Sequence, residues 1–422
     1  MSTEAEVRAE LSGWLAQNWD PDATVAQWWD LLCDSGWAVP AWPEDWFGRG
    51  LGRDMGRVVG DEMRKAGALG PPSGLGMMLA GPTIISHGTD AQKAHYLRRI
   101  VNGQDGWCQL FSEPGAGSDL ASLQTRAERD GDEWVVSGQK VWTSGGLVAD
   151  VGMLIARTDP DVPKHKGITY FAIDMHQPGV EVRALREMTG HALFAEVFLD
   201  EARVASDAII GGLGNGWAVA KTTLANERAG LGAGGGGAAG GAVPGRVMNV
   251  LDKPAGDYVQ EGRRGGAGVP GLLGSAPTML LELARERGVT GDPHVRQELA
   301  RLYSLGEIGR FTILRTKAAL AAGRGPGPEA NTAKLAMSAM VRLTRDLGLE
   351  ICGAAGMLAG EDAPLHGAVT EMALFSPAPS IYGGTDQIQR NIIGERSLGL
   401  PREPDNSHEI PFRELKVGTQ TA

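Results

Sequence analysis

The sequence predicts an α+β chain of several domains, in which a β-rich middle part separates two helical parts. Apolar residues recur at helical spacing through the first hundred residues, alternate after Gly106, and return to helical spacing from Gly216. A chain of 422 residues has room for two or three domains. We therefore expect domains at 1–105, 106–206 and 207–402, followed by a tail at 403–422.

The first part reads as helical throughout. Val7, Leu11 and Leu15 follow a helical period, and the GTDAQKAHYL stretch places an Asp early in a helix with apolar residues behind it. A turn-rich segment, VPAWPEDWFGRGLG, interrupts the helices at 39–52. The expected helices cover 4–19, 24–35, 54–65, 72–87 and 90–102.

The middle part has strand character. Its strand-like runs are separated by the turn signals DG at 130–131, SG at 137–138 and PG at 178–179. Closely spaced runs joined by short turns indicate an antiparallel β domain. The expected strands follow Gly106 and then cover 124–129, 133–140, 151–157, 167–173, 180–185 and 194–204.

The last part contains an unusual glycine-rich segment at 230–274. Glycine disfavours helix by about 1 kcal/mol relative to alanine, so a long regular helix through AGGGGAAGG is not expected. The segment is interpreted as a flexible, irregular insertion. Close helix–helix contact through small residues is the alternative. Helices are expected to resume at 278–287, 294–322, 331–352 and 365–374.

Composition excludes several classes of protein. The net charge of −11 argues against a nucleic-acid partner, which requires clustered Lys and Arg. The three cysteines are far apart and the eight histidines lack metal-binding spacing, so neither disulfides nor a metal are expected, and a reducing cytoplasm is the natural setting. The acidic N-terminus does not read as a signal peptide, and no apolar run is long enough to span a membrane.

The most informative stretch is 381–401, IYGGTDQIQRNIIGERSLGLP, in which a Gly-Gly-Thr turn leads into an amphipathic helix. Gly383 and Gly384 allow positive φ or a close approach to a ligand. Thr385 occupies the N-cap position, ahead of Gln387. The start of a capped helix favours an anionic ligand or a reduced flavin. A loop that merely caps a core helix would show the same pattern.

This stretch closely resembles the C-terminal signature of acyl-CoA dehydrogenases, and the resemblance extends from about 42 to 401 apart from the insertion. It implies a C-terminal four-helix bundle, FAD as cofactor, and oxidation of an acyl-CoA to the trans-2-enoyl-CoA. It also implies an electron-transfer flavoprotein or similar acceptor and a homodimer or homotetramer, with a hetero-oligomer possible. The runner-up functions are an acyl-CoA oxidase and a non-catalytic subunit of a hetero-oligomeric enzyme.

Two further motifs resemble the family's flavin site, SEPGAGSD at 112–119 and QKVWTS at 139–144. In the family the first motif and the strand before it lie along the flavin, and the second supplies an aromatic wall and hydroxyl groups. Ser118 and Gly383 would also contact the substrate. The resemblance therefore assigns to the cofactor Gln109, Phe111, Ser112, Gly117, Ser118, Trp142, Thr143, Ser144, Thr385 and Gln387.

The catalytic base requires a separate argument. Many family members place a glutamate where this chain has Gly383, which cannot take a proton. A second group in the family carries the base on an upstream helix in a Glu-Arg pair, present here as Glu227–Arg228. Glu227 is therefore the expected base, with a solvated helix carboxylate as the alternative, and Arg228 is expected to meet the CoA moiety.

The remaining cofactor assignments lie across the expected dimer. An Arg-x-x-Phe-Gly motif that binds the FAD pyrophosphate of a neighbouring subunit has its nearest match at Arg287, with the Phe replaced. The turn containing Gly353 and Gly356 resembles a second loop of the same contact.

Overall fold

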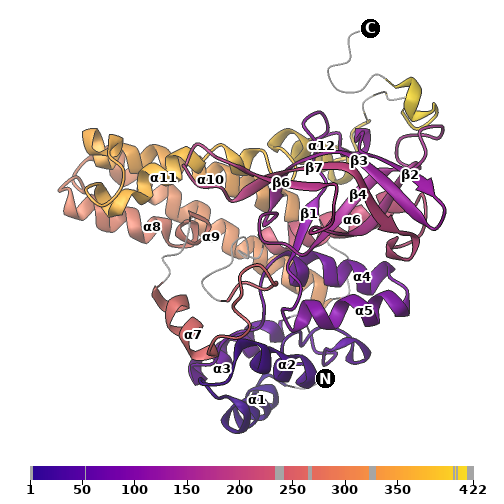
Figure 1. The fold of residues 1–422 in the computed structure, drawn as a ribbon. Helices are drawn as coiled ribbons and strands as arrows, with labels where there is room; N and C mark the ends of the chain where they lie inside the picture. Colours follow the sequence, from indigo (N-terminus) through magenta and orange to yellow (C-terminus); the bar gives the residue numbers. More distant parts are fainter. Residues whose placement is uncertain are drawn as a thin grey trace.

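The computed structural model describes residues 3–52, 54–232, 242–264, 269–322, 329–402, 404 and 407–415. Figure 1 shows N-terminal helices in indigo, a magenta β-sheet beside them, and long orange and yellow helices that extend away from both. This arrangement confirms the predicted fold class of helical, β and helical parts.

The N-terminal helices begin where their capping residues predict. Thr3, Thr24 and Thr89 each form a capping box with the side chain three residues ahead. The predicted helix at 72–87 begins about three residues later, after Gly74 with its φ of +104°, and its first part is a π-helical turn that runs into α4. The elements are α1 (Glu4–Asn18), α2 (Val25–Ser35), η1 (Glu44–Trp46), α3 (Met55–Ala66), η2 (Gly76–Ala80), α4 (Gly81–His87) and α5 (Asp90–Val101).

The middle part forms one mixed sheet in the order β1-β4-β2-β3-β7-β6, with β5 paired to β4. Most neighbours are antiparallel, as predicted for this domain, but β1 pairs with β4 in parallel and β2 meets β4 in parallel at one residue pair, so the sheet is mixed. Asp150 and Val151 donate backbone hydrogen bonds to Gly106 O, which aligns the starts of β1 and β4. The strands are β1 (Trp107–Leu110), β2 (Arg126–Asp130), β3 (Glu133–Ser144), β4 (Val151–Arg157), β5 (Ile168–Asp174), β6 (Val180–Leu185) and β7 (Phe194–Ala205).

The C-terminal helices gather around α10, which contacts α6, α8, α9, α11 and α12. Helix α8 begins earlier than predicted, at Val269, because Pro270 lies in its first turn, where proline is tolerated. The helices are α6 (Gly216–Gly232), α7 (Ala255–Arg264), α8 (Val269–Glu286), α9 (Pro293–Ala321), α10 (Glu329–Cys352), α11 (Ala368–Phe375) and α12 (Asp386–Ser397). Short 3-10 turns are η3 (Leu120–Ser122), η4 (Ser206–Ala208), η5 (Gly353–Met357), η6 (Pro364–Gly367), η7 (Ala378–Ser380) and η8 (Phe412–Glu414).

The described part of the insertion, residues 242–264, is packed structure, and we call it the strap. Ala242, Val250 and Ala255 are buried in the core of the N-terminal helices. Backbone hydrogen bonds join Val25 N to Lys253 O at 2.9 Å and Ala255 N to a carbonyl before α2 at 2.8 Å. The predicted loose insertion is therefore wrong for this stretch. The glycine run at 233–241 and residues 265–268 lie outside the described residues.

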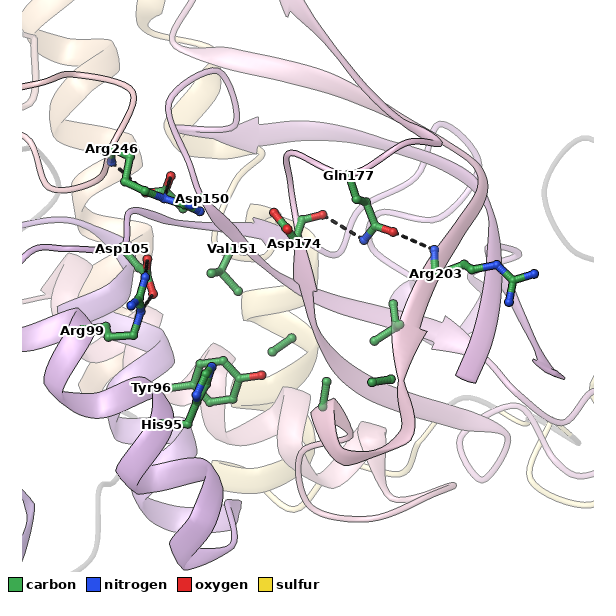
Figure 2. A pocket seen from close by; sticks show the side chains of 14 residues that line it. His95, Tyr96, Arg99, Asp105, Asp150, Val151, Asp174, Gln177, Arg203 and Arg246 are labelled. Atoms are coloured by element: carbon green, nitrogen blue, oxygen red, sulfur yellow. Dashed lines mark hydrogen bonds and ion pairs between the residues drawn. The ribbon is translucent and has the colours of Figure 1, made fainter. Parts of the chain in front are cut away.

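Asp150 anchors the strap to the rest of the chain (Figure 2). Its fully buried carboxylate accepts hydrogen bonds from Gly106 N at 2.9 Å and from both Arg246 N and Arg246 Nε at 3.0 Å, and it pairs with His176 Nε2 at 3.1 Å. Gly245 adopts φ +108°, and a Cβ there would lie 2.7 Å from Asp150 Oδ2. One carboxylate thus joins the start of β1, the turn after β5 and the strap.

Candidate active site

Glu227 lies on α6 and faces the strand that precedes the SEPGAGSD motif. Gln109 Nε2, on β1, donates a hydrogen bond to Glu227 Oε2 at 3.4 Å. Gln109 was expected to contact the cofactor, and in this structure its amide meets the candidate base. The contact joins two residues that are 118 positions apart in the sequence and belong to different domains.

The surroundings of Glu227 shift the pKa of its carboxyl upward. Burial raises the pKa of its carboxyl, while the hydrogen bond from Gln109 and the positive charge of Arg228 act in the opposite direction. Burial lowers the pKa of Arg228, which is close enough to Arg396 of α12 for their charges to interact. The Arg396 end of α12 therefore lies near Arg228. The alternative of a freely solvated glutamate does not fit this position.

A buried ion pair holds the motifs at 112–119 and 139–144 together. Lys140 Nζ, in the second motif, donates to Glu113 Oε1 at 2.8 Å and to Phe111 O at 3.0 Å. Glu113 also accepts backbone hydrogen bonds at 124 and 125. Burial opposes ionisation of Glu113, but Lys140 and these hydrogen bonds keep its pKa below the usual value. Ser112 O accepts from the backbone N–H that follows Lys140, at 2.9 Å.

The VWTS segment presents an exposed aromatic ring beside a buried hydroxyl. Trp142 has a φ of +61°, which is uncommon for a residue with a bulky side chain, and it is 58% exposed. Its ring meets Phe194 edge to face at 5.7 Å. Thr143 is fully buried, and its Oγ1 has no hydrogen-bond partner among the described residues. Ser144 is half-buried at the end of β3.

The loop formed by the first motif leaves open space in front of it. Gly117 and Ser118 are exposed, and an added Cβ at Gly115 or Gly117 would meet nothing within 4 Å. Lys164 pairs with Asp119 at 2.9 Å and holds the end of the loop against the sheet. This loop has room for a ligand at its glycines.

The Gly-Gly-Thr turn has the predicted conformation. Gly383 and Gly384 have positive φ, and Thr385 caps α12 through a 3.2 Å hydrogen bond to the N–H of the residue three positions ahead. Buried Gln389 donates to Gly383 O at 2.8 Å and thereby braces the turn. Gln387, a predicted cofactor residue, is exposed at the start of the helix.

A second group of predicted cofactor residues lies at the other end of the bundle. Arg287 follows α8 and is exposed, and its charge reaches Cys352, next to the turn that holds Gly353 and Gly356. At the opposite end of α10, Lys334 donates a hydrogen bond to Asp386 of α12. Lys334 and Cys352 are about 27 Å apart along the α10 axis. The two ends are well separated in Figure 1.

Comparison with known proteins agrees with these observations. Sequence models of the acyl-CoA dehydrogenase N-terminal, middle and C-terminal domains match residues 3–104, 108–202 and 263–398. Acyl-CoA dehydrogenase IpdE1 of Mycobacterium tuberculosis is 34% identical over 420 residues, covering 96% of this chain and 99% of that protein. The chain belongs to the acyl-CoA dehydrogenase family.

Other similar proteins are of the same kind. Acyl-CoA dehydrogenase FadE34 of M. tuberculosis is 37% identical over 88% of this chain, and the chain spans 46% of that longer protein. The steroid ACAD Tcur3481-Tcur3483 superposes with a TM-score of 0.70 at 27% identity, covering 95% of this chain and 98% of that one. The ChsE4-ChsE5 complex of M. tuberculosis gives 0.66 at 27% identity, covering 96% and 99%.

Acyl-CoA dehydrogenases are oxidoreductases that use FAD, and the VWTS segment fits that cofactor. A buried hydroxyl without a partner is costly, and the polar edge of a flavin would satisfy Thr143 Oγ1. The exposed Trp142 ring, held in an uncommon backbone conformation, offers a stacking surface.

Several residues that shape this acyl-CoA dehydrogenase site were not predicted. Glu113 and Lys140 lie inside quoted motifs, but a lysine on a strand usually faces solvent, so no sequence signal indicated their buried ion pair. Asp386 and Gln389 brace the turn from α12, and Asp386 accepts from Lys334 at 3.2 Å and Arg342 at 3.1 Å. No sequence pattern identifies those partners.

A cavity of about 420 Å³ between α5 and the sheet is not this site (Figure 2). Its lining includes Arg99, Asp105, Asp150, Asp174 and Arg246, and none of the predicted site residues. Arg99 pairs with Asp105 at 2.6 Å, so the charges of these two side chains neutralise each other. Among the described residues, no helix has the length and apolarity to cross a membrane, and no cluster of His, Cys, Asp and Glu is arranged to hold a metal.

Proposed function

We propose that this chain dehydrogenates an acyl-CoA thioester to the trans-2-enoyl-CoA, with Glu227 removing the α-proton; FAD, when bound, would supply the acceptor for the β-hydride. The observation that carries the proposal is the half-buried Glu227 carboxylate in contact with Gln109 at the strand leading into the SEPGAGSD motif. Gly383, at the other position the family uses for a base, has no side chain that takes a proton.

The protein groups around Glu227 have distinct roles in this scheme. FAD, when bound, supplies the two-electron acceptor, which no side chain provides. Glu227 takes the proton in a partly dry site, where its raised pKa suits a general base. Gly383 offers its N–H to the thioester carbonyl, which acidifies the α-proton. Arg228 provides a cation for the CoA moiety.

The test isolates proton removal from hydride transfer. 3,3-Dimethylbutyryl-CoA has α-hydrogens but no β-hydrogen, so the enzyme in D2O exchanges its α-protons without reducing the flavin. Glu227→Gln is expected to slow this exchange by ~100-fold or more, the loss expected for a general base. Glu286→Gln, at an exposed position on α8, is the control and keeps the wild-type rate.

Normal exchange in Glu227→Gln with FAD still bound would refute the assignment of the base. Adding Gly383→Glu to the same variant sharpens the test. Partial recovery of exchange would support two positions that address the same carbon atom.

We also propose that the active form is an oligomer in which FAD contacts two chains. Arg287, Gly353 and Gly356 lie far along α10 from the Thr385 end, so one bound dinucleotide within a single chain would not meet both groups. Helix α9 exposes a group of large apolar side chains that suits a protein interface, made of Tyr303, Ile308, Phe311 and Leu314. Electron-transfer flavoprotein or a similar protein would reoxidise the flavin.

The partner is a second copy or a different chain. The similar structure titled as a ChsE4-ChsE5 complex favours a hetero-oligomer, which keeps the non-catalytic subunit as the second candidate function. The molar mass and the visible spectrum of the purified chain distinguish the enzyme from the non-catalytic subunit. A yellow homo-oligomer bleached by an acyl-CoA supports the enzyme, whereas a colourless protein that turns yellow with a second chain supports the subunit.

Acyl specificity and oxygen use complete the proposal. The similar structure described as a steroid ACAD makes both straight-chain and ring-bearing acyl-CoAs appropriate test substrates. Stopped-flow reoxidation of the reduced enzyme under air distinguishes a dehydrogenase, which reacts slowly with oxygen, from an oxidase.

A further inference from the structure

A cluster of three hydroxyl groups lies inside the protein one helical turn before Glu227. Thr223 Oγ1, on α6, is hydrogen-bonded to Thr83 Oγ1 of α4 at 2.9 Å and to Tyr170 OH of β5 at 3.3 Å. All three residues are at most 1% exposed. Burial raises the pKa of the Tyr170 phenol, so it remains a neutral hydroxyl. We call these residues the hydroxyl cluster.

The cluster lies on the face of α6 that carries the candidate base. Residues four apart share one face of an α-helix, and Thr223 is four residues before Glu227. Their backbones are separated by about 6 Å along the axis. A rotation of α6 that displaced Thr223 would therefore displace the Glu227 carboxylate in the same direction.

The cluster also connects α6 to the flavin strand. The Tyr170 ring meets the Phe111 ring edge to face at 5.9 Å, and Phe111 belongs to the strand end that Lys140 holds. At the start of α6, Gly216 packs on the backbone of β5, where an added Cβ would lie 2.5 Å from the Thr169 carbonyl carbon. Helix α6 therefore contacts β5 at its first residue and again at the hydroxyl cluster.

Packing alone does not explain this arrangement. The surrounding core is apolar and includes Leu79, Ile84, Val219 and Ala220. Apolar side chains of similar volume would fill the same space without the need to pair three hydroxyl groups, and directional hydrogen bonds add a fixed orientation. A general base gains from such a constraint, because a misplacement of about 1 Å costs on the order of 100-fold in rate.

We propose that Thr83, Thr223 and Tyr170 are positioning residues that fix the rotation of α6 and so aim the Glu227 carboxylate at the substrate α-carbon. This inference rests on the proposed role of Glu227. Thr223 does not touch the reacting atoms and acts through the helix.

The test compares valine and serine at one position. Thr223→Val keeps the shape and removes the hydroxyl, whereas Thr223→Ser keeps the hydroxyl. The matched control is Thr222→Val, which removes the 2.8 Å hydrogen bond between Thr222 and His87, another contact between α6 and α4 on a different face. Thr83→Val removes the same Thr83–Thr223 bond from the α4 side.

The readouts are α-proton exchange of 3,3-dimethylbutyryl-CoA in D2O, FAD content, the melting temperature, and the primary isotope effect for α-deuterated substrate. Thr223→Val and Thr83→Val are expected to exchange ~10-fold more slowly with FAD content unchanged. The isotope effect should rise because proton removal becomes more rate-limiting. Thr223→Ser should recover most of the rate, and Thr222→Val should match the wild type.

Three results would overturn the inference: wild-type exchange in both valine variants, failure of serine to rescue, or an equal loss in Thr222→Val. The last would indicate general weakening of the helix contact. Glu227→Gln measured alongside separates the two proposals. Loss of exchange in Glu227→Gln without loss in Thr223→Val rejects only the positioning role, and normal exchange in Glu227→Gln rejects the base assignment itself.

Discussion

Replacing Gln109 by leucine tests the environment of Glu227 most directly. The substitution keeps the size of the side chain and removes the amide that donates to Glu227 Oε2 at 3.4 Å. A hydrogen bond this long to a charged group contributes about 1 kcal/mol, or roughly fivefold in an ionisation equilibrium. Since the amide stabilises the carboxylate, its loss should raise the pKa of Glu227 further.

The sign of the effect on rate follows from the role of the base. Glu227 must be ionised to take a proton, so α-proton exchange rises with pH as the carboxyl titrates. The Gln109→Leu profile should shift to higher pH, with ~5-fold slower exchange on the acidic limb and the wild-type rate on the alkaline plateau.

A matched control exists on another strand. Gln139 donates a hydrogen bond to Glu196 at 3.4 Å. This Gln–Glu bond has the same length as the bond between Gln109 and Glu227, but it joins β3 to β7, away from α6. Gln139→Leu should leave the profile unchanged. Superimposable profiles for Gln109→Leu and the wild type would refute the reasoning, as would a loss of equal size at every pH, which would show that Gln109 affects geometry and not ionisation.

Three further substitutions test the rest of the site. Trp142→Ala should weaken FAD binding several-fold, because a stacked ring contributes about 1 kcal/mol, measured by the fluorescence of released FAD. Lys140→Met should destabilise the fold by about 3–5 kcal/mol in urea titration, since Glu113 is left buried without its partner, whereas Arg183→Met at an exposed pair should change little. Asp150→Ala should release the strap, so that limited trypsin cleaves first within residues 242–264. A wild-type digestion pattern would show that the backbone hydrogen bonds hold the strap unaided.

Local features of the fold were predicted well from the sequence because local rules govern them. The strands at 151–157 and 180–185 were predicted at their observed bounds, since turn-forming residues flank both and the second also alternates. The cap at Thr385 and the positive φ of Gly383 follow from residue type in the same way. The roles assigned to these residues in FAD and substrate binding stay predictions.

Features that depend on distant contacts could not be predicted. The parallel pairing of β1 with β4 rests on hydrogen bonds from Asp150 and Val151 to Gly106. The spacing of apolar residues in the sequence does not indicate which strands pair. The contact between Gln109 and Glu227 likewise requires two domains to be docked. Glycine content indicated a loose insertion, but tertiary packing of the strap outweighs local propensity.

The strap also has a consequence for how the polypeptide acquires its structure during synthesis. Ala242, Val250 and Ala255 complete a core whose other buried residues all lie within the first 101 positions of the chain. A nascent chain therefore carries an unfinished first domain until more than half of its length has been translated. Such long-range closure slows folding and exposes apolar surface in the interim. The N-terminal helices are consequently not an autonomous folding unit, and a fragment that stops before the strap should need the missing segment, supplied separately as a peptide, to become compact.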